Sequence, residues 1–216
     1  MRIDTTTFCL KNRPSFVAFE GINGCGKTTL MRGLSERLRS GGAQVVDTRE
    51  PGGTPLGAEI RKLVLAWEGE KKSDRAELLL FAADRAEHID KVIRPSREAG
   101  SWVLCDRFIY STITFQGHGR GIRRDWIDQA NTLATQGFLP DLVVLLDLDP
   151  ITARARVEAR IGNGRDSFEE EELSFHTRIR NGFLECADAL PTPFLVLDAT
   201  QTPEDLLRTV EQALGV

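Results

Sequence analysis

The sequence predicts an α/β fold of three layers, in which helices flank a five-stranded parallel sheet and a small lid completes the domain. The first observation is that five short apolar segments recur along the chain, separated by stretches of helical periodicity. The second is a glycine-rich turn that directly follows the first of these segments. Strands that are buried on both faces of a parallel sheet have this apolar character.

Strands and helices are expected to alternate along the chain. The expected strands are 16–20, 43–48, 102–105, 142–147 and 193–198. The expected helices are 27–39, 56–67, 74–98, 124–136, 151–160, 169–188 and one that closes the chain. In such sheets ligands bind at the carboxyl ends of the strands, so polar residues that follow strands are expected to line a site. These residues are Glu20, Thr48, Arg49, Asp106, Arg107 and Asp147.

The turn after the first strand has the spacing of a phosphate-binding P-loop, in the sequence FVAFEGINGCGKTT at 16–29. Its glycines tolerate unusual backbone angles, so that successive N–H groups can surround a polyphosphate at the positive end of the next helix. We expect Lys27 to reach the β- and γ-phosphates and the Thr28 hydroxyl to bind Mg²⁺. The alternative is a glycine-rich turn with an incidental lysine.

The motif therefore predicts a P-loop NTPase fold that binds ATP or GTP. The residues expected to hold the nucleotide are Gly21, Ile22, Asn23, Gly24, Cys25, Gly26, Lys27, Thr28 and Thr29.

Length and composition indicate one ordinary globular domain. The chain has 216 residues, of which 41% are hydrophobic and 28% charged. We expect a single domain at 15–216, preceded by a polar extension at 1–14. The net charge of −4 argues against general binding to nucleic acid.

The cysteines and the hydropathy of the chain predict a cytoplasmic protein that does not associate with a membrane. Cys9, Cys25, Cys105 and Cys186 lack CxxC spacing, as expected in a reducing compartment. No segment approaches the run of about 18 apolar residues that a membrane-spanning helix needs.

Two classes of P-loop protein are disfavoured. The Asn-Lys-x-Asp tetrapeptide that reads guanine in GTPases is absent from the sequence. Mechanical ATPases usually end a strand in Asp-Glu, whereas here Asp106 is followed by Arg107 and Asp147 by Leu148. A cation beside a strand-end carboxylate suggests a second phosphate group to be held.

Five segments together resemble the thymidylate kinase family and occur in its order. They are FEGINGCGKTT, TREPGGTPLG, LLFAADRAEH, DRFIYSTITFQG and the arginine-rich stretch after LDLDP. The likeness extends from Ser15 over almost all of the chain. It implies transfer of the γ-phosphoryl group of ATP to dTMP, giving dTDP and ADP, with Mg²⁺ and usually in a homodimer.

The resemblance assigns roles at the ends of the first and third strands. Glu20 becomes an acidic residue close to the transferred phosphate and the metal, although a solvated strand-end glutamate is the simpler reading. Asp106 is expected to hold hydrated Mg²⁺ and Arg107 to grip the dTMP phosphate. A structural ion pair, in which Asp106 mainly orients an arginine, is the alternative.

The family uses a Phe-x-x-x-Arg pair for thymine, matched here by Phe81 and Arg85 on one helix face. Without the surrounding motif, the same pair would be read as a core phenylalanine and a surface arginine. The acceptor side is further expected to include Arg49, Thr112, Phe115 and Gln116. The family commonly has tyrosine at position 115, so rejection of a 2′-hydroxyl here is expected to rest on shape, with UMP a poor acceptor.

A lid is expected at about 154–168, where arginines can neutralise the charge of the transferred phosphoryl group. One subgroup of the family has its catalytic arginine inside the P-loop, at the position of Gly24 here, so this chain resembles the subgroup whose lid supplies it. Arg160 is the first candidate and Arg165 the second. A basic, solvated helix is the alternative for this stretch.

Two other functions remain open from the sequence. One is a different deoxynucleotide or deoxynucleoside kinase of the same fold, which the identity of the acceptor would separate. The other is a nucleotide-binding switch without turnover, which would form no ADP in response to an acceptor.

Overall fold

The computed structural model describes residues 1–4, 8–161, 168–169 and 171–216, with only the backbone of residues 160 and 161. Within this part of the chain lies a parallel sheet in the order β2-β3-β1-β4-β5. Its strands are β1 (Phe16–Glu20), β2 (Val45–Arg49), β3 (Trp102–Asp106), β4 (Leu142–Asp147) and β5 (Phe194–Asp198). The predicted α/β fold with a five-stranded parallel sheet is confirmed.

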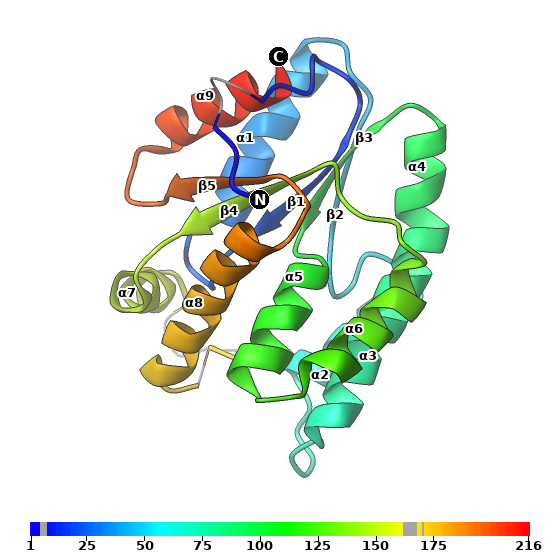
Figure 1. The fold of residues 1–216 in the computed structure, drawn as a ribbon, viewed down its shortest axis with the longest axis vertical. Coiled ribbons are helices and arrows are strands. Elements are labelled where there is room, and N and C mark those ends of the chain that lie inside the picture. The colour runs from blue at the N-terminus through cyan, green and yellow to red at the C-terminus, as the bar shows by residue number, and fades with distance from the viewer. Residues whose placement is uncertain (5–7, 162–167, 170) are drawn as a thin grey trace.

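Helices cover both faces of the sheet (Figure 1). On one side, α1 (Lys27–Ser40) packs against α9 (Pro203–Leu214). On the other side lie α4 (Arg94–Glu98), α5 (Ile109–Thr112) and α8 (Leu173–Ala189). The remaining helices are α2 (Pro55–Leu65), α3 (Asp74–His88), α6 (Arg124–Thr135) and α7 (Pro150–Ile161). The layers match those expected from the alternation of apolar strands and amphipathic helices.

Three helical segments differ from the sequence expectation. The stretch 74–98 is helical throughout, but a π-helical turn, η1 (Ile89–Ile93), separates α3 from α4. Pro95 follows this turn and has no backbone N–H to donate. Its ring would also clash with the carbonyl of the residue four positions earlier in a regular α-helix, and the wider π-helical turn relieves this clash. The helix expected from 169 begins at Leu173, with Glu172 as its N-cap residue.

The third segment, α5 with η2 (Ile113–Gly119), is a helical region that periodicity missed. Its sequence is rich in β-branched and aromatic residues, which have low helix propensity. Contacts with α8 and α6 stabilise it instead. This matters because η2 carries residues of the candidate site.

The described N-terminal residues pack against the rest of the domain. The Ile3 N–H donates to the Phe194 carbonyl at 2.9 Å, and the Leu10 N–H donates to the Ala213 carbonyl at 2.9 Å. The side chains of Ile3, Phe8 and Leu10 pack against the core. The described part of 1–14 therefore braces β5 and α9.

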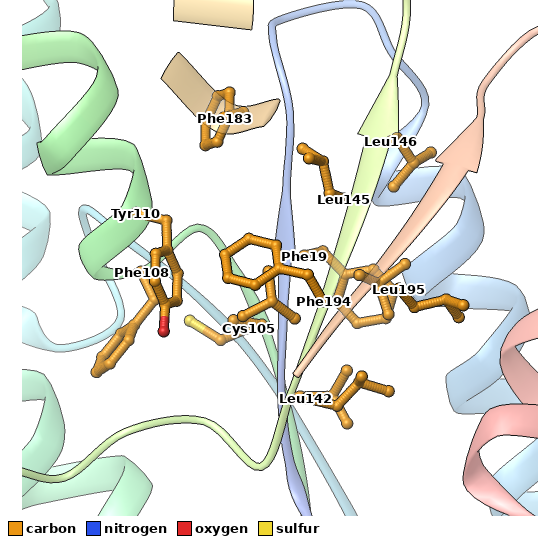
Figure 2. Close-up of a cluster of buried hydrophobic side chains, with 14 of the residues drawn as sticks. Phe19, Cys105, Phe108, Tyr110, Leu142, Leu145, Leu146, Phe183, Phe194 and Leu195 are labelled. Atoms are coloured by element: carbon orange, nitrogen blue, oxygen red, sulfur yellow. The ribbon is translucent and has the colours of Figure 1, made fainter. Parts of the chain in front are cut away.

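The core lies around the central strands. Figure 2 shows Phe19 of β1, Cys105 of β3 and Phe194 of β5 in one cluster of buried side chains. Tyr110 meets Phe194 edge to face, with ring centroids 4.7 Å apart. Close packing of this kind makes the carboxyl ends of β1 and β3 rigid supports for polar side chains.

Candidate active site

A cavity of about 570 Å³ lies at the carboxyl ends of the strands. The P-loop forms one end of it, and the ends of β2 and β3 form its floor. Side chains of α3, of the α5–η2 region, of α7 and of the β5–α9 connection complete its walls. The predicted site residues that line it are Asn23, Gly24, Cys25, Gly26, Lys27, Thr28, Thr29, Arg49, Phe81, Arg85, Asp106, Arg107, Thr112, Phe115 and Gln116.

The P-loop has the backbone that its glycines predict. Gly21, Gly24 and Gly26 have φ angles of 133°, 83° and 105°, which residues other than glycine rarely adopt. A Cβ on Gly24 would lie 2.4 Å from the Ala153 carbonyl oxygen. Position 24 therefore excludes any side chain, and an arginine here is sterically impossible without moving α7.

Lys27 lies against the loop that precedes it. Its ammonium group is buried and donates to the carbonyls of Gly21 at 3.1 Å and Ile22 at 3.2 Å. Gly21 and Ile22 themselves are absent from the cavity lining. They contribute backbone that holds the lysine beside the space a phosphate would enter.

Thr28 and Asp106 meet although they are distant in sequence. The Thr28 hydroxyl donates to Asp106 Oδ2 at 3.1 Å. The other carboxylate oxygen, Oδ1, is buried and has no hydrogen-bond partner among the described residues. A hydroxyl beside such a carboxylate oxygen fits a hydrated divalent cation, since Mg²⁺ keeps several waters and needs few protein ligands. No cluster of three or more His, Cys, Asp or Glu side chains suited to a metal occurs in the part of the chain that the structure describes.

Arg107 connects the P-loop to the opposite end of the cavity. Its Nη1 donates to the Gly21 carbonyl and to Ser111 Oγ, both at 3.0 Å, and Nη2 donates to Asn23 Oδ1. Its guanidinium carbon lies 4.9 Å from the ring centroid of Phe115. The residue has a φ angle of 76°, an uncommon conformation outside glycine, and so β3 ends in a turn that directs the chain into α5.

Glu20 does not line the cavity, contrary to the expectation from its place in the sequence. Its side chain is fully buried, where its Oε1 accepts from the N–H groups of Phe108 at 2.8 Å and Ser111 at 3.1 Å. Oε2 accepts from the Ser111 hydroxyl at 2.6 Å. In this structure Glu20 therefore supports the turn that carries Arg107.

Burial raises the pKa of Glu20 to about 7, against the opposing effects of Arg107, the Ser111 and Phe108 hydrogen bonds and Lys27. Since this pKa lies above that of the unfolded chain, Glu20 stabilises the fold below about pH 4.5, and this stabilisation is lost as the pH rises through about 7. Between about pH 5 and about pH 8, we expect the unfolding free energy of the wild type to fall by about 2 kcal/mol relative to Glu20→Gln. Urea unfolding at both pH values measures this change. A difference that stays constant with pH would contradict it.

Aromatic rings enclose the end of the cavity away from the P-loop. Phe115 lies edge to face with Phe168, with centroids 5.4 Å apart, and Phe81 lies 6.2 Å from Phe168. Gln116 is buried and donates to Glu77 Oε1 at 2.9 Å. The predicted pair of Phe81 and the buried Arg85 is thus brought to one wall, where a planar ring could stack.

Several cavity residues had no individual role assigned from the sequence. Glu50 and Pro51, joined by a cis peptide bond, line the site together with Arg61, whose Nη1 donates to the Pro51 carbonyl at 2.9 Å. Ser111 also lines it. For Arg61 the sequence predicted only a place on a helix. The TREPGGTPLG segment marked the loop of Glu50 and Pro51 as functional but assigned no role to either residue.

Besides Glu20, two other residues that follow strands do not line the cavity. Asp147 forms a bidentate ion pair with Arg180, at 2.6 and 2.8 Å, and does not line the cavity. The Thr48 hydroxyl bonds to His88 Nε2 at 2.6 Å instead. The rule that polar residues after strands line the site therefore holds for Arg49, Asp106 and Arg107.

The arginines of the expected lid divide into three groups. Arg156 lines the cavity and donates to the Ala199 carbonyl at 3.1 Å. Arg154 forms an exposed ion pair with Glu158. The side chain of Arg160 and the whole of Arg165 lie outside the described residues.

A P-loop that shares one cavity with an arginine at the end of the neighbouring parallel strand is the arrangement expected of a P-loop nucleotide kinase. The family model for thymidylate kinase matches residues 19–210. The chain therefore belongs to the thymidylate kinase family, as the five segments predicted.

Individual relatives support this placement over nearly the full chain. The thymidylate kinase of Bdellovibrio bacteriovorus is 42% identical over 208 residues, covering 95% of this chain and 97% of the relative. That of Citrifermentans bemidjiense is 47% identical over 190 residues, covering 86% and 84%. That of Desulfovibrio desulfuricans is 45% identical over 206 residues, covering 92% and 94%.

Proposed function

We propose that the protein transfers the γ-phosphoryl group of ATP to dTMP, forming dTDP and ADP. One observation carries this proposal: a single cavity joins the P-loop to the aromatic wall of Phe81 and Phe115, with Arg107 between them. Donor and acceptor can therefore meet without domain rearrangement. Positioning and charge neutralisation provide most of the rate enhancement in such transfers.

The donor is held by the P-loop. Its backbone N–H groups and Lys27 surround the phosphates, and the N-terminus of α1 adds its positive dipole. Thr28 and Asp106 would hold Mg²⁺, which supplies neutralisation of the donor phosphates. Gln201, Pro203 and Leu206 line the cavity near the start of α9 and offer a surface for the rest of the donor nucleotide.

The acceptor is held at the opposite end. Arg107 and Arg49 are cations positioned for its phosphate, and the Arg49 side chain makes no hydrogen bond or ion pair with the described residues. Phe81 would stack on thymine while Arg85 offers a donor to its edge. Thr112 and Gln116 lie on the same wall, where Phe115 leaves shape alone to reject a 2′-hydroxyl.

The lid arginines Arg160 and Arg165 are proposed to stabilise the transferred group. The steric exclusion of any side chain at Gly24 supports this, since it leaves no room for an arginine inside the P-loop. We expect Arg160→Ala to lower kcat roughly 100-fold with little change in either KM, because the interaction forms in the transition state. Steady-state kinetics with both substrates varied measures the effect.

Arg154→Ala is the matched control, because Arg154 lies on the same helix and is paired with Glu158 on the surface. It should leave kcat within about 2-fold of the wild type. If Arg160→Ala behaves like this control, the role belongs to Arg165 or Arg156 and the first assignment is wrong.

A homodimer in the cytoplasm is the proposed state of the protein. Helices α2, α3 and α6 lie next to one another and expose large apolar side chains. These side chains are Leu56, Leu63, Leu79, Trp126 and Leu133. Such a surface supports burial against a second copy.

The four cysteines carry free thiols, as a reducing compartment requires. No described helix could span a membrane.

The test is an acceptor panel. Mg-ATP is supplied with dTMP, dUMP, UMP, dCMP or thymidine, and the nucleotide products are separated. We expect efficient conversion of dTMP, weak conversion of UMP and none of thymidine. Phosphorylation of thymidine would indicate a deoxynucleoside kinase, and the absence of any acceptor-dependent ADP would indicate a nucleotide-binding switch.

A further inference from the structure

A network of buried polar side chains lies beneath the acceptor end of the cavity, where α3 meets the loop that follows β2. Arg85 is only 1% exposed, and its partner Glu50 is 4% exposed. His88 lies about one turn after Arg85 on the same helix and is completely buried. His88 does not line the cavity, so it cannot contact a substrate directly.

Glu50 contacts Arg85 and His88 through different carboxylate oxygens. Its Oε2 accepts a hydrogen bond from Arg85 Nε at 2.8 Å and lies in ionic contact with Arg85 Nη2, also at 2.8 Å. Its Oε1 lies 3.0 Å from His88 Nδ1. A buried carboxylate needs every oxygen satisfied, so the histidine fixes the rotation of the group that Arg85 grips.

His88 is itself oriented from its far side. Its Nε2 lies 2.6 Å from the Thr48 hydroxyl, on β2. A neutral imidazole satisfies both contacts when Nδ1 donates to Glu50 and Nε2 accepts from Thr48. A Cβ on Gly53 would lie 2.5 Å from the imidazole ring, so the loop packs directly on His88.

The guanidinium of Arg85 is thereby held in place through Nε and Nη1. Nη1 donates to Thr112 Oγ1 and to Asn131 Oδ1, both at 3.0 Å. Together with the Nε bond to Glu50, these bonds involve three of the five N–H groups of an arginine. The two remaining N–H groups are on Nη2, which lies 2.8 Å from Glu50 Oε2, and Arg85 lines the cavity. A small rotation of Glu50 would shift Nη2 away from a bound base.

We propose that His88 is a positioning residue for the acceptor nucleotide, which acts through Glu50 to hold Nη2 of Arg85 toward the base. This inference rests on the proposed function, because it assigns the base-reading donor to Arg85. The series Thr48–His88–Glu50–Arg85 is called the positioning relay below. It predicts an effect on acceptor binding from a residue that touches no substrate.

The test uses His88→Phe, which keeps a ring of similar volume and removes both nitrogen atoms. We expect KM for dTMP to rise about 10-fold, while kcat and KM for ATP stay within about 2-fold of the wild type. His88→Asn keeps a donor near the position of Nδ1 and should bring KM for dTMP back to within about 3-fold. The matched control is His118→Phe, a histidine beside Glu185 outside the cavity, which should leave KM for dTMP unchanged.

A double variant tests whether His88 acts through Glu50. If it does, adding His88→Phe to Glu50→Gln should raise KM for dTMP no further than Glu50→Gln alone. Multiplicative effects of the two changes would overturn the relay. So would a KM for dTMP that stays unchanged in a folded His88→Phe protein, or a loss that falls equally on ATP.

Failure of the relay and failure of the proposed function are distinguishable. A wild-type protein that forms no ADP with dTMP refutes the function, whereas an active wild type with an unaffected His88→Phe variant refutes the relay alone. If His88→Phe does not fold, Thr48→Val removes only the hydroxyl beside Nε2. It should then raise KM for dTMP about 3-fold, and an unchanged value would overturn the relay.

Discussion

Lys27→Met should lower kcat roughly 1000-fold, the largest effect expected of a single change in the donor site. Lys27 is 7% exposed and its ammonium group is held by the Gly21 and Ile22 carbonyls, so it is in place before the nucleotide arrives. Methionine has a similar length but no charge, and it leaves the phosphoryl oxygens without this neutralisation. Steady-state kinetics at saturating dTMP measures the loss.

Lys62→Met is the control for this variant. Lys62 is a surface residue of α2 whose ammonium group pairs with Glu59, and it does not line the cavity. Its replacement should leave kcat within about 2-fold. A Lys27→Met protein that retained more than about a tenth of the wild-type kcat would contradict the assigned role.

Arg107→Met should lower kcat/KM for dTMP roughly 1000-fold while KM for ATP changes little. Its guanidinium contacts the P-loop through Gly21 and Asn23 and lies over the ring of Phe115, between the two halves of the cavity. The variant would lose the bidentate grip on the acceptor phosphate that we propose for Arg107. Initial rates at varied dTMP and fixed, saturating ATP provide the measurement.

Arg107→Lys separates charge from geometry at the same position. Lysine keeps the charge but cannot present two parallel donors, so we expect kcat/KM for dTMP to recover only to about one hundredth of the wild-type value. A lysine variant as active as the wild type would show that a point charge suffices. An Arg107→Met protein that lost affinity for ATP alone would place the residue on the donor side.

Much of the fold could be predicted because its signals are local. The apolar strands and the P-loop glycines impose their own conformation, and the φ angles of Gly21, Gly24 and Gly26 agree with that expectation. The meeting of Thr28 with Asp106 also follows, since β1 and β3 are neighbours whose carboxyl ends lie at one edge. Motif and topology together thus located most of the cavity.

The remaining features depend on tertiary contacts that no local pattern encodes. Glu20 faces the turn at Phe108 and Ser111 and not the cavity. This orientation depends on how α5 starts after β3, which the local sequence does not reveal. The pairing of Glu50 with His88 requires the loop after β2 to cross α3. The π-helical turns arise where Pro95 and packing against α8 override helix propensity.

The central claim is that this cavity transfers the γ-phosphoryl group of ATP to dTMP. The most direct measurement supplies ATP labelled at the γ-phosphate together with dTMP and Mg²⁺, and separates the products. The account predicts label in dTDP, with one ADP formed for each dTDP. Label recovered only in inorganic phosphate or in unreacted ATP, with no labelled dTDP, would contradict it.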